Sequence, residues 1–388
     1  MSMPAPTVSQ EEELHWLALR LIPGLGTRSA GRLLAKFRSP QAVFRATRTE
    51  LEGAGVSGGV AQSIASGCSF EDAVAQQEKI RETGAAVITM GDAAYPALLR
   101  EIYDPPIVLF ARGRVELLQS IVFAIVGTRR PTPYGLAAAE RLAGDLARAG
   151  LTIASGMARG IDTAAHRAAL AAEGDSIAVL GCGVDVVYPS ENRRLAADLA
   201  TKGLIISEFP MGAVAFPQNF PIRNRIIAGM SVGIMVVEGA QYSGSAITAK
   251  LALEQGREVF AVPGNITSKA SWGPNLLIKQ GAKLVQEWND VVVELPAETR
   301  RALVAKAHAR SAGNSLETQG TQLQLDGATG PAHNALLNRI QPDLPTHMDQ
   351  LLETFDNLTS SEIVAALFDL ELLGLIKQLP GKNFVKVW

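Results

Sequence analysis

Residues 122–130 read VFAIVGTRR, and residues 151–162 read LTIASGMARGID. Each stretch begins as a short, almost uninterrupted apolar run and then passes into a polar segment that contains glycine. Apolar runs without alternation are typical of parallel strands buried on both faces, and glycine permits a tight turn from strand to helix. The two stretches therefore predict successive strands of one parallel sheet.

The same pattern recurs through the middle of the chain. Further apolar runs lie at residues 177–180, 204–207, 233–237 and 259–262, with alanine-rich helical stretches at 136–148, 163–172, 195–199 and 246–255. Strands that alternate with helices predict right-handed crossovers. Residues 85–90 and 107–112 are expected to add strands before this unit. The predicted fold class is α/β, with a Rossmann-like, doubly wound, mainly parallel sheet.

Both flanks of this unit have a different pattern. Residues 10–84 predict an N-terminal helical domain of short amphipathic helices, residues 85–295 the extended Rossmann-like domain, residues 296–330 a linker and residues 331–388 a winged helix. Within the first domain, residues 22–26 (IPGLG) resemble the turn of a helix-hairpin-helix, whose backbone amides can contact phosphates. A plain helical packing unit would give the same pattern.

The winged helix is predicted from three helical stretches and a hairpin. The stretches are residues 333–340, 347–355 and 360–373, and the hairpin pairs residues 375–379 with 384–387. The third helix carries Glu362, Asp369 and Glu371. Acidic groups there favour contact with a protein over reading of the DNA major groove.

Composition excludes several classes of protein. The 388 residues hold 36 Lys and Arg against 38 Asp and Glu, so the net charge of −2 excludes a polycation that coats nucleic acid. Two cysteines, Cys68 and Cys182, cannot build a disulfide framework or a four-cysteine zinc site. No signal-peptide core and no apolar run long enough for a membrane span is found. We expect a cytoplasmic protein without membrane contact.

Three predicted strands end in small, polar segments at the same edge of the sheet. Gly127, Thr128 and Arg129 follow the first strand, Ser155, Gly156 and Arg159 the second, and Ser243 and Gly244 follow residues 233–237. Ligands of open parallel sheets bind at this edge, and amides at helix N-termini favour anions. The pattern predicts a phosphate-binding site, although each turn alone could be structural.

Residues 220–229 (FPIRNRIIAG) are the most informative stretch. Arg223 and Arg225 flank Asn224 just before a buried apolar run. One interpretation is a loop whose guanidinium groups bind phosphates. The alternative is a pair of structural ion pairs, with Glu208 and Glu238 as partners.

Catalytic patterns are weak. The chain has no dinucleotide fingerprint after the first strand and no P-loop lysine. Asp162 and His166 lie one helical turn apart, but no third ligand follows, so Asp162 is expected to stabilise a helix start. Ser155 has no assigned base. We therefore expect no catalytic residue, no metal and no cofactor.

These motifs together closely resemble the DNA-processing protein A (Smf) family of bacterial natural transformation. The resemblance rests, in chain order, on Tyr95-Pro96, Asp104-Pro105-Pro106, Val126–Arg129, Tyr134-Gly135, Ser155–Asp162, Tyr188-Pro189, Ser207-Glu208, Phe220–Gly229, Ser243–Ser245 and Val262-Pro263-Gly264. It covers residues 85–285 densely, and both flanking domains are similar to those of longer members.

The resemblance implies a cytosolic homodimer that protects single-stranded DNA and loads the recombinase RecA onto it, without catalysis. Family positions imply DNA contacts by Gly127, Thr128, Arg129 and Phe220, with Arg223 and Arg225 matching the Arg-Asn-Arg motif. Many members carry a lysine shortly before the Phe-Pro pair, whereas residues 211–219 here contain no basic residue. Arg159 is the expected substitute.

Two further expectations concern partners. Leu276, Leu277 and Ile278 form an apolar row that predicts the dimer contact, and the resemblance places RecA contact in the same region. Other competence proteins are expected partners of the acidic winged helix. The alternative function is a Rossmann-like sensor of a nucleotide-derived ligand or a phosphoribohydrolase-type enzyme, although the Pro-Gly-Gly loop of such enzymes is absent.

Overall fold

The structure is a computed structural model that describes residues 9–303 apart from residue 242, and residues 331–341, 344–355, 358–359, 362–364, 366–367, 370, 375–379 and 381–386. Contacts divide the chain into two compact units, Met1–Ala307 and His308–Trp388. Most of the predicted linker, from residue 304 onward, lies outside the described residues.

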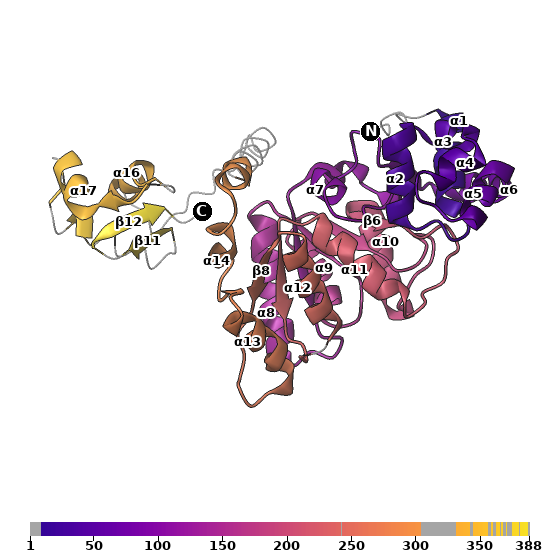
Figure 1. Ribbon diagram of the computed structural model, residues 1–388. Helices are drawn as coiled ribbons and strands as arrows, with labels where there is room; N and C mark the ends of the chain where they lie inside the picture. Colours follow the sequence, from indigo (N-terminus) through magenta and orange to yellow (C-terminus); the bar gives the residue numbers. More distant parts are fainter. Residues whose placement is uncertain are drawn as a thin grey trace. The chain divides into compact units, whose positions relative to one another are not determined.

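The first unit begins with six short helices (Figure 1). They are α1 (Gln10–Leu21), α2 (Thr27–Phe37), α3 (Pro40–Arg45), α4 (Arg48–Glu52), α5 (Gly58–Ser66) and α6 (Phe70–Thr83). Hydroxyl N-caps start several of them: Ser9 accepts from Glu12 N, and Thr47 forms a capping box with Glu50. Their core continues into the sheet, because Leu17 and Leu33 belong to the same buried cluster as Phe110.

A nine-stranded sheet lies at the centre of the remaining part of this unit. The strands are β1 (Ala86–Thr89), β2 (Val108–Gly113), β3 (Val122–Gly127), β4 (Thr152–Ser155), β5 (Ser176–Val179), β6 (Leu204–Ser207), β7 (Gly233–Val237), β8 (Glu258–Ala261) and β9 (Lys283–Leu284). Their spatial order is β1-β2-β6-β5-β4-β3-β7-β8-β9. The block from β6 to β9 is parallel, while β2 pairs antiparallel with both β1 and β6.

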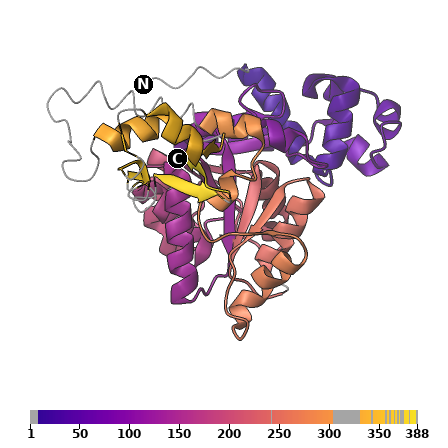
Figure 2. The same ribbon diagram turned by 90° about the vertical axis from the view of Figure 1, so that its left-hand side faces the viewer.

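Helices cover both faces of this sheet (Figure 2). The helices are α7 (Ala97–Arg100), α8 (Pro133–Arg148), α9 (Ile161–Ala171), α10 (Arg193–Lys202), α11 (Asn219–Gly229), α12 (Gly244–Glu254), α13 (Trp272–Lys279) and α14 (Asn289–Val292). Successive residues of β3 face opposite cores: Ala124 packs with α11 and α12, and Ile125 packs with α8 and α9. This double covering explains the unbroken apolar runs of the strands.

The predicted α/β fold is confirmed, and the predicted strands occur within one or two residues of their expected bounds. One prediction needs correction. Residues 220–229 were expected to form a loop, but they lie in helix α11. Pro221 is compatible with this helix because it lies in the first turn, where the backbone N–H has no helical acceptor.

The second unit holds a small three-stranded sheet of order β10-β12-β11. Its elements are α16 (Pro331–Arg339), β10 (Thr346–His347), α17 (Met348–Thr354), β11 (Ile376–Leu379) and β12 (Asn383–Lys386). The hairpin of β11 and β12 was predicted, whereas β10 was not. Leu336, Leu351 and Phe384 share the core of this unit.

The structure describes only one of the three acidic residues predicted on the third helix of the winged helix. Asp369 and Glu371 lie outside the described residues. Glu362 accepts hydrogen bonds from Thr359 in a helix cap.

Among the described residues, no helix is long and apolar enough to cross a membrane.

Candidate functional site

The strand order places a topological switch point between β3 and β7. The chain runs from β3 through β4 and β5 to β6 on one side, then returns to add β7 and β8 on the other. Loops diverge beyond the carboxyl ends of the strands at such a point, which makes it the usual ligand site of open sheets. The predicted site segments after β3, β4 and β7 all lie at this edge.

A stacked column of side chains stands at this edge. The guanidinium carbon of Arg129 lies 5.3 Å from the ring centre of Phe220, and that ring lies 5.5 Å from the ring of Tyr188. Arg129 is exposed, Phe220 is half-buried, and Tyr188 is 43% exposed. The column therefore offers one cation and two aromatic rings to a ligand. It brings Arg129 and Phe220 together as the sequence predicts.

Local packing fixes the position of Phe220. A Cβ atom built on Gly181 would lie 3.0 Å from the Phe220 ring, so the ring rests directly on this backbone after β5. The neighbouring Asn219 donates from its side-chain amide to Gly181 O at 2.9 Å. The base of the column is thus preorganised before any ligand arrives.

Arg159, the expected substitute for the missing lysine, is engaged in an ion pair. Its Nε donates to Glu191 Oε1 at 3.0 Å, and both side chains are more than half exposed. An exposed pair of this kind is weak and can exchange its partner for a phosphate. Arg159 therefore lies at the predicted edge, beside a competing carboxylate.

Arg223 is enclosed by the protein. Its Nη1 donates to Val179 O at 2.6 Å, and a Cβ on Gly156 would lie 1.9 Å from the same nitrogen. Burial lowers the pKa of Arg223 to about 10, while the Asp162 carboxylate opposes that shift. The guanidinium therefore remains charged at neutral pH and holds the β4 and β5 loops together.

Arg225 is also structural. Its side chain is 7% exposed, and it donates to Glu208 Oε2 at 2.7 Å and to Asp104 Oδ2 at 3.1 Å. The prediction that Arg223 and Arg225 bind phosphates is corrected by this burial. The alternative ion pair with Glu208 is present, whereas Glu238 instead accepts from Thr132 N at 2.8 Å.

Most of the predicted polar turn groups are used inside the protein. Ser155 Oγ donates to Ile125 O, Gly156 N donates to Asp162, and Thr128 N donates to Glu238 O. Asn224 is buried and its amide lies 3.5 Å from Gly244 O. Gly127 packs against Val237 O, while Ser243 caps α12 and Gly244 is exposed. The cation and aromatic rings, rather than amides and hydroxyls, form the accessible site.

Two residues of this edge were not predicted as site residues. Tyr188 belongs to a quoted motif, but nothing in its spacing showed that it would stack on Phe220. Arg130 is exposed next to Arg129. Its position directly after Arg129 in the Gly-Thr-Arg-Arg turn could have identified it as a site residue.

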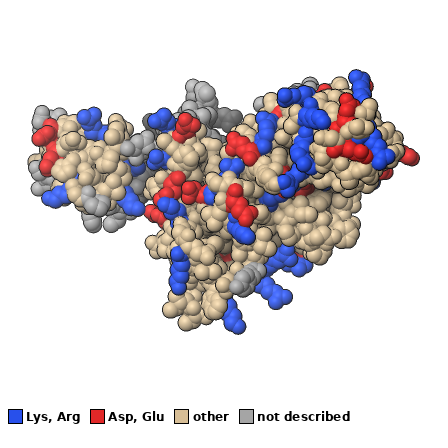
Figure 3. Space-filling model, in the orientation of Figure 1, with Lys and Arg blue, Asp and Glu red and all other residues tan. Residues whose placement is uncertain are grey.

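The overall charge of the protein determines how much anion binding must depend on this local site. Figure 3 shows Lys and Arg side chains intermixed with Asp and Glu over the upper part of the face in view, and mainly Lys and Arg toward its lower end. The net charge of −2 provides no overall cationic field to attract a polyanion. Contact with an anion must depend on specific groups such as Arg129.

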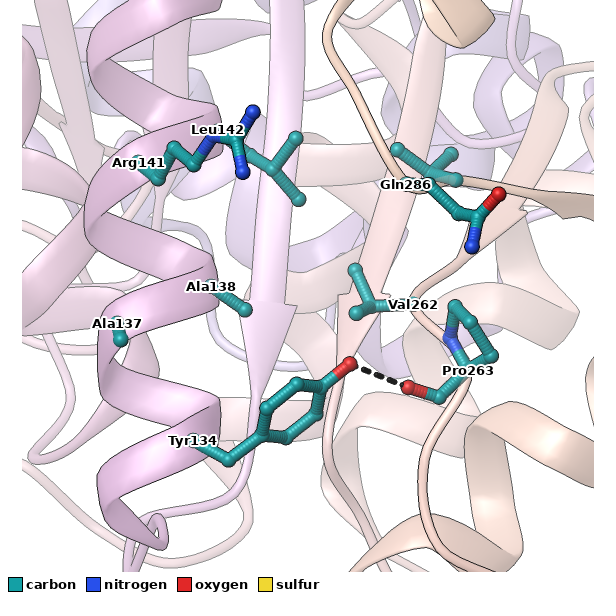
Figure 4. A pocket seen from close by; sticks show the side chains of 9 residues that line it. Tyr134, Ala137, Ala138, Arg141, Leu142, Val262, Pro263 and Gln286 are labelled. Atoms are coloured by element: carbon teal, nitrogen blue, oxygen red, sulfur yellow. Dashed lines mark hydrogen bonds between the residues drawn. The ribbon is translucent and has the colours of Figure 1, made fainter.

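A separate pocket of about 340 Å³ lies between α8 and the ends of β8 and β9 (Figure 4). Its lining is mainly apolar, with Arg141 and Gln286 as polar groups, and Tyr134 Oη donates to Pro263 O at 2.6 Å. The Tyr134 hydroxyl is therefore used in bracing α8 against the β8 loop. No sequence pattern indicated this pocket.

The titratable groups near the edge are not arranged as a catalytic set. Burial lowers the pKa of His166 to about 3 and raises the pKa of Cys182 to about 11. Asp162 accepts from Gly156 N and Ala158 N, which is a bracing role. Among the described residues, no three His, Cys, Asp or Glu side chains gather as a metal site.

Fold and site together define a Rossmann-like protein with a separate C-terminal unit and with exposed cationic and aromatic side chains at the switch-point edge of its sheet. The family model of the DNA recombination-mediator protein A matches residues 86–296, and that of the DprA winged helix domain matches residues 323–382. The chain belongs to the DNA recombination-mediator protein A (DprA/Smf) family.

Relatives and solved structures agree with this assignment. Protein Smf of Synechocystis is 33% identical over 97% of this chain and 99% of its own length. The DNA processing protein DprA of Bacillus subtilis is 46% identical over 56% of this chain and 73% of its own. The X-ray structure of DprA from Streptococcus pneumoniae has a TM-score of 0.64 and 34% identity, over 73% of this chain and 98% of that one.

A structure of DNA processing protein A from Helicobacter pylori is also similar, with a TM-score of 0.50 and 28% identity over 57% of this chain and 96% of that one. That structure concerns the single-stranded DNA binding mode of the Helicobacter pylori protein.

Proposed function

We propose that this chain is a cytoplasmic protein that binds single-stranded DNA and loads RecA onto it during natural transformation. The observation that carries the proposal is the column of Arg129, Phe220 and Tyr188 at the switch point of the sheet. Membership of a recombination-mediator family supports the step toward RecA. The Helicobacter pylori relative supports single-stranded DNA as the ligand.

The column suits unpaired DNA for a physical reason. An aromatic ring can stack on any base once that base is free of its partner strand, and a guanidinium beside it attracts the phosphate of the same nucleotide. Bases inside a duplex present only their edges. Binding should therefore be independent of sequence and weaker for duplex DNA.

We also propose that the protein has no catalytic activity on nucleotides. Ser155 donates its hydroxyl proton to Ile125 O, and Asp162 is buried in bonds to backbone amides, so neither is placed for attack on a substrate. Incubation with nucleoside phosphates should release neither base nor phosphate. Steady release that Asp162→Asn abolishes would contradict this proposal.

Titration of a labelled oligothymidine at several salt concentrations tests the DNA site. Arg129→Glu should show the largest defect, because it removes a cation and adds repulsion. Phe220→Ala should cost about 1–3 kcal/mol with little change in salt slope, since stacking releases no counterions. Arg167→Glu makes the same charge change at an exposed arginine of α9 that is not among the predicted site residues, and it is the control.

Each outcome has a separate meaning. Unchanged affinity in a folded Arg129→Glu protein would remove the column from the DNA site and leave the winged helix as the better candidate. Stabilisation by mononucleotides but not by oligonucleotides would instead favour a nucleotide sensor. RecA loading is tested by the lag of RecA ATPase on DNA precoated with a single-strand-binding protein, which the wild type should shorten and Arg129→Glu should not.

A further inference from the structure

The loop that leads into α11 is braced by the N-terminal helices. Gln76 on α6 exchanges two hydrogen bonds with Met211: its amide nitrogen donates to Met211 O at 3.3 Å, and Met211 N donates to its oxygen at 2.8 Å. Arg20 on α1 donates from Nε to Glu208 O at 3.2 Å. Met211 itself is buried in the core shared by the helices and the sheet.

The sheet side holds the same loop from the other direction. Gly212 N donates to both carboxylate oxygens of Asp185 at 2.9 Å, and Gly183 N donates to Ala213 O at 2.9 Å. A segment with this many backbone bonds has little freedom left to lose on binding.

Two apolar side chains of this braced loop nevertheless face solvent. Val214 and Phe216 are each 52% exposed. About half of the Phe216 side chain is left in water, and a partly exposed ring on a rigid segment presents a preformed stacking surface. Phe216 and Phe220 are four positions apart in the chain, so their Cα atoms are at most about 14 Å apart. Phe216 therefore lies close to the column already described.

A lysine from another part of the chain stands beside this loop. Residues 211–219 contain no Lys or Arg. However, Lys79 Nζ lies 3.8 Å from the position that a Cβ on Gly212 would occupy. Lys79 is one turn beyond Gln76 on α6, so the residue that braces the loop also directs the lysine toward it. In the part of the chain that the structure describes, exposed Lys79 forms no ion pair.

We propose that the single-stranded DNA path continues from Phe220 onto a second subsite, in which Phe216 stacks on a base and Lys79 contacts a phosphate. The inference rests on the proposed function, because it extends the same strand of DNA. It gives the N-terminal helical domain a direct part in binding. It also supplies, from a distant segment, the cation that the loop lacks.

An abasic scan tests the stacking half of this subsite. A set of oligothymidines, each with one abasic nucleotide at a different position, is titrated against the wild type, Phe216→Ala and Phe220→Ala. At one position the missing base should weaken wild-type binding but leave Phe216→Ala unaffected, because the partner ring is already gone. The single substitution should reduce affinity roughly 5- to 150-fold. Val293→Ala, at another exposed apolar residue, is the control.

Salt dependence tests the phosphate half. Lys79→Gln should reduce the slope of log affinity against log salt by about 0.7, the value for one phosphate contact on a single strand. Lys36→Gln, which makes the same charge change on α2 of the same domain, should leave the slope unchanged.

The outcomes separate this inference from the proposed function. Wild-type binding that depends on Phe220 but not on Phe216 or Lys79 overturns the second subsite alone. Absence of wild-type binding to single-stranded DNA overturns both. If folded Phe216→Ala binds DNA normally but loses a protein partner, the exposed ring serves that partner and the subsite is wrong.

Discussion

Two arginines at the same edge of the sheet differ in whether their guanidinium groups reach solvent. Arg129 and Arg223 both occur in glycine-containing or turn-like patterns at the same edge of the sheet, yet Arg129 is exposed and Arg223 is buried against Val179 O. The difference arises from tertiary packing, because Arg223 occupies the space left by the absent side chain of Gly156. Sequence patterns could therefore locate this edge but could not sort its arginines into exposed and buried groups.

Gly156→Ala should destabilise the protein. The new Cβ would lie 1.9 Å from Arg223 Nη1, and the guanidinium cannot move without losing its bond to Val179 O. Overpacking of this kind costs about 1–3 kcal/mol in the free energy of unfolding. Gly244→Ala is the matched control, since a Cβ there meets nothing within 4 Å. Urea unfolding of both variants measures the difference, and equal midpoints would show that Arg223 can relocate freely.

His166 should make stability depend on pH. Its Nδ1 lies 2.8 Å from Ser176 Oγ, whose proton is donated to Ile153 O, so the ring donates in its neutral form. Burial lowers its pKa to about 3 from the ordinary value of 6.5. Between these values the unfolded chain binds more protons than the folded one, so stability falls as the pH drops below 6.5.

The measurement compares the wild type with His166→Gln at pH 7 and pH 5. When the unfolded state binds one more proton than the folded state, the free energy of unfolding falls by about 1.4 kcal/mol for each pH unit. Since this difference applies below pH 6.5, the wild type should lose about 2 kcal/mol more stability than the variant between pH 7 and pH 5. The comparison cancels the titration of carboxylates common to both proteins. Parallel pH profiles for the two proteins would contradict a neutral, buried His166.

At the scale of elements, strands were easier to predict than α11. Unbroken apolar runs such as β7 gave bounds that the structure reproduces. Helix α11 gave no amphipathic pattern, because it is buried around most of its circumference: Arg223, Asn224 and Arg225 are enclosed together with Ile226 and Ile227. A helix without a solvent-facing stripe lacks the 3.6-residue period on which recognition depends.

Thr132→Val should disrupt the start of α8. The Thr132 hydroxyl accepts from Gly135 N as the helix cap and donates to Glu238, and the Glu238 carboxylate is buried. Losing a cap costs about 1 kcal/mol, and leaving a buried carboxylate short of a donor costs about 2 kcal/mol more. Thr47→Val removes only the exposed capping box of α4 and should cost about 1 kcal/mol in thermal unfolding. Equal losses would mean that water replaces the Glu238 contact.

At the scale of the whole molecule, the sequence predicted the order of the parts better than their contacts. Residues 10–84 were expected to form a domain of their own, and they do contain the helices α1 to α6. Yet Leu17 shares a core with Phe110, and Arg20 contacts Glu208 across 188 positions of the chain. The periodicity of a helix indicates which of its faces is buried but not which distant element covers that face. The shared core of the N-terminal helices and the sheet therefore could not be predicted from the sequence.

The homodimer remains a prediction for the face that α13 presents. Leu276, Leu277 and Ile278 are all half-buried, with Leu277 packed against the core next to α12. Trp272 and Leu284 nearby are 54% and 45% exposed. An apolar surface of this kind can be buried by a second copy across a twofold axis, where every contact occurs twice. Ile278→Glu would then bury two charges in one interface, each at a cost of several kcal/mol.

We therefore expect Ile278→Glu to be monomeric by light scattering at concentrations where the wild type is dimeric, with an unchanged circular dichroism spectrum. Gln280→Glu introduces the same charge at an exposed position two residues away and should remain dimeric. A dimer would also place two DNA sites on one particle, which raises apparent affinity through effective concentration. The monomeric variant should consequently bind short oligothymidines as the wild type does but lose affinity for long ones. If Ile278→Glu stays dimeric, the twofold contact lies on another face of the molecule.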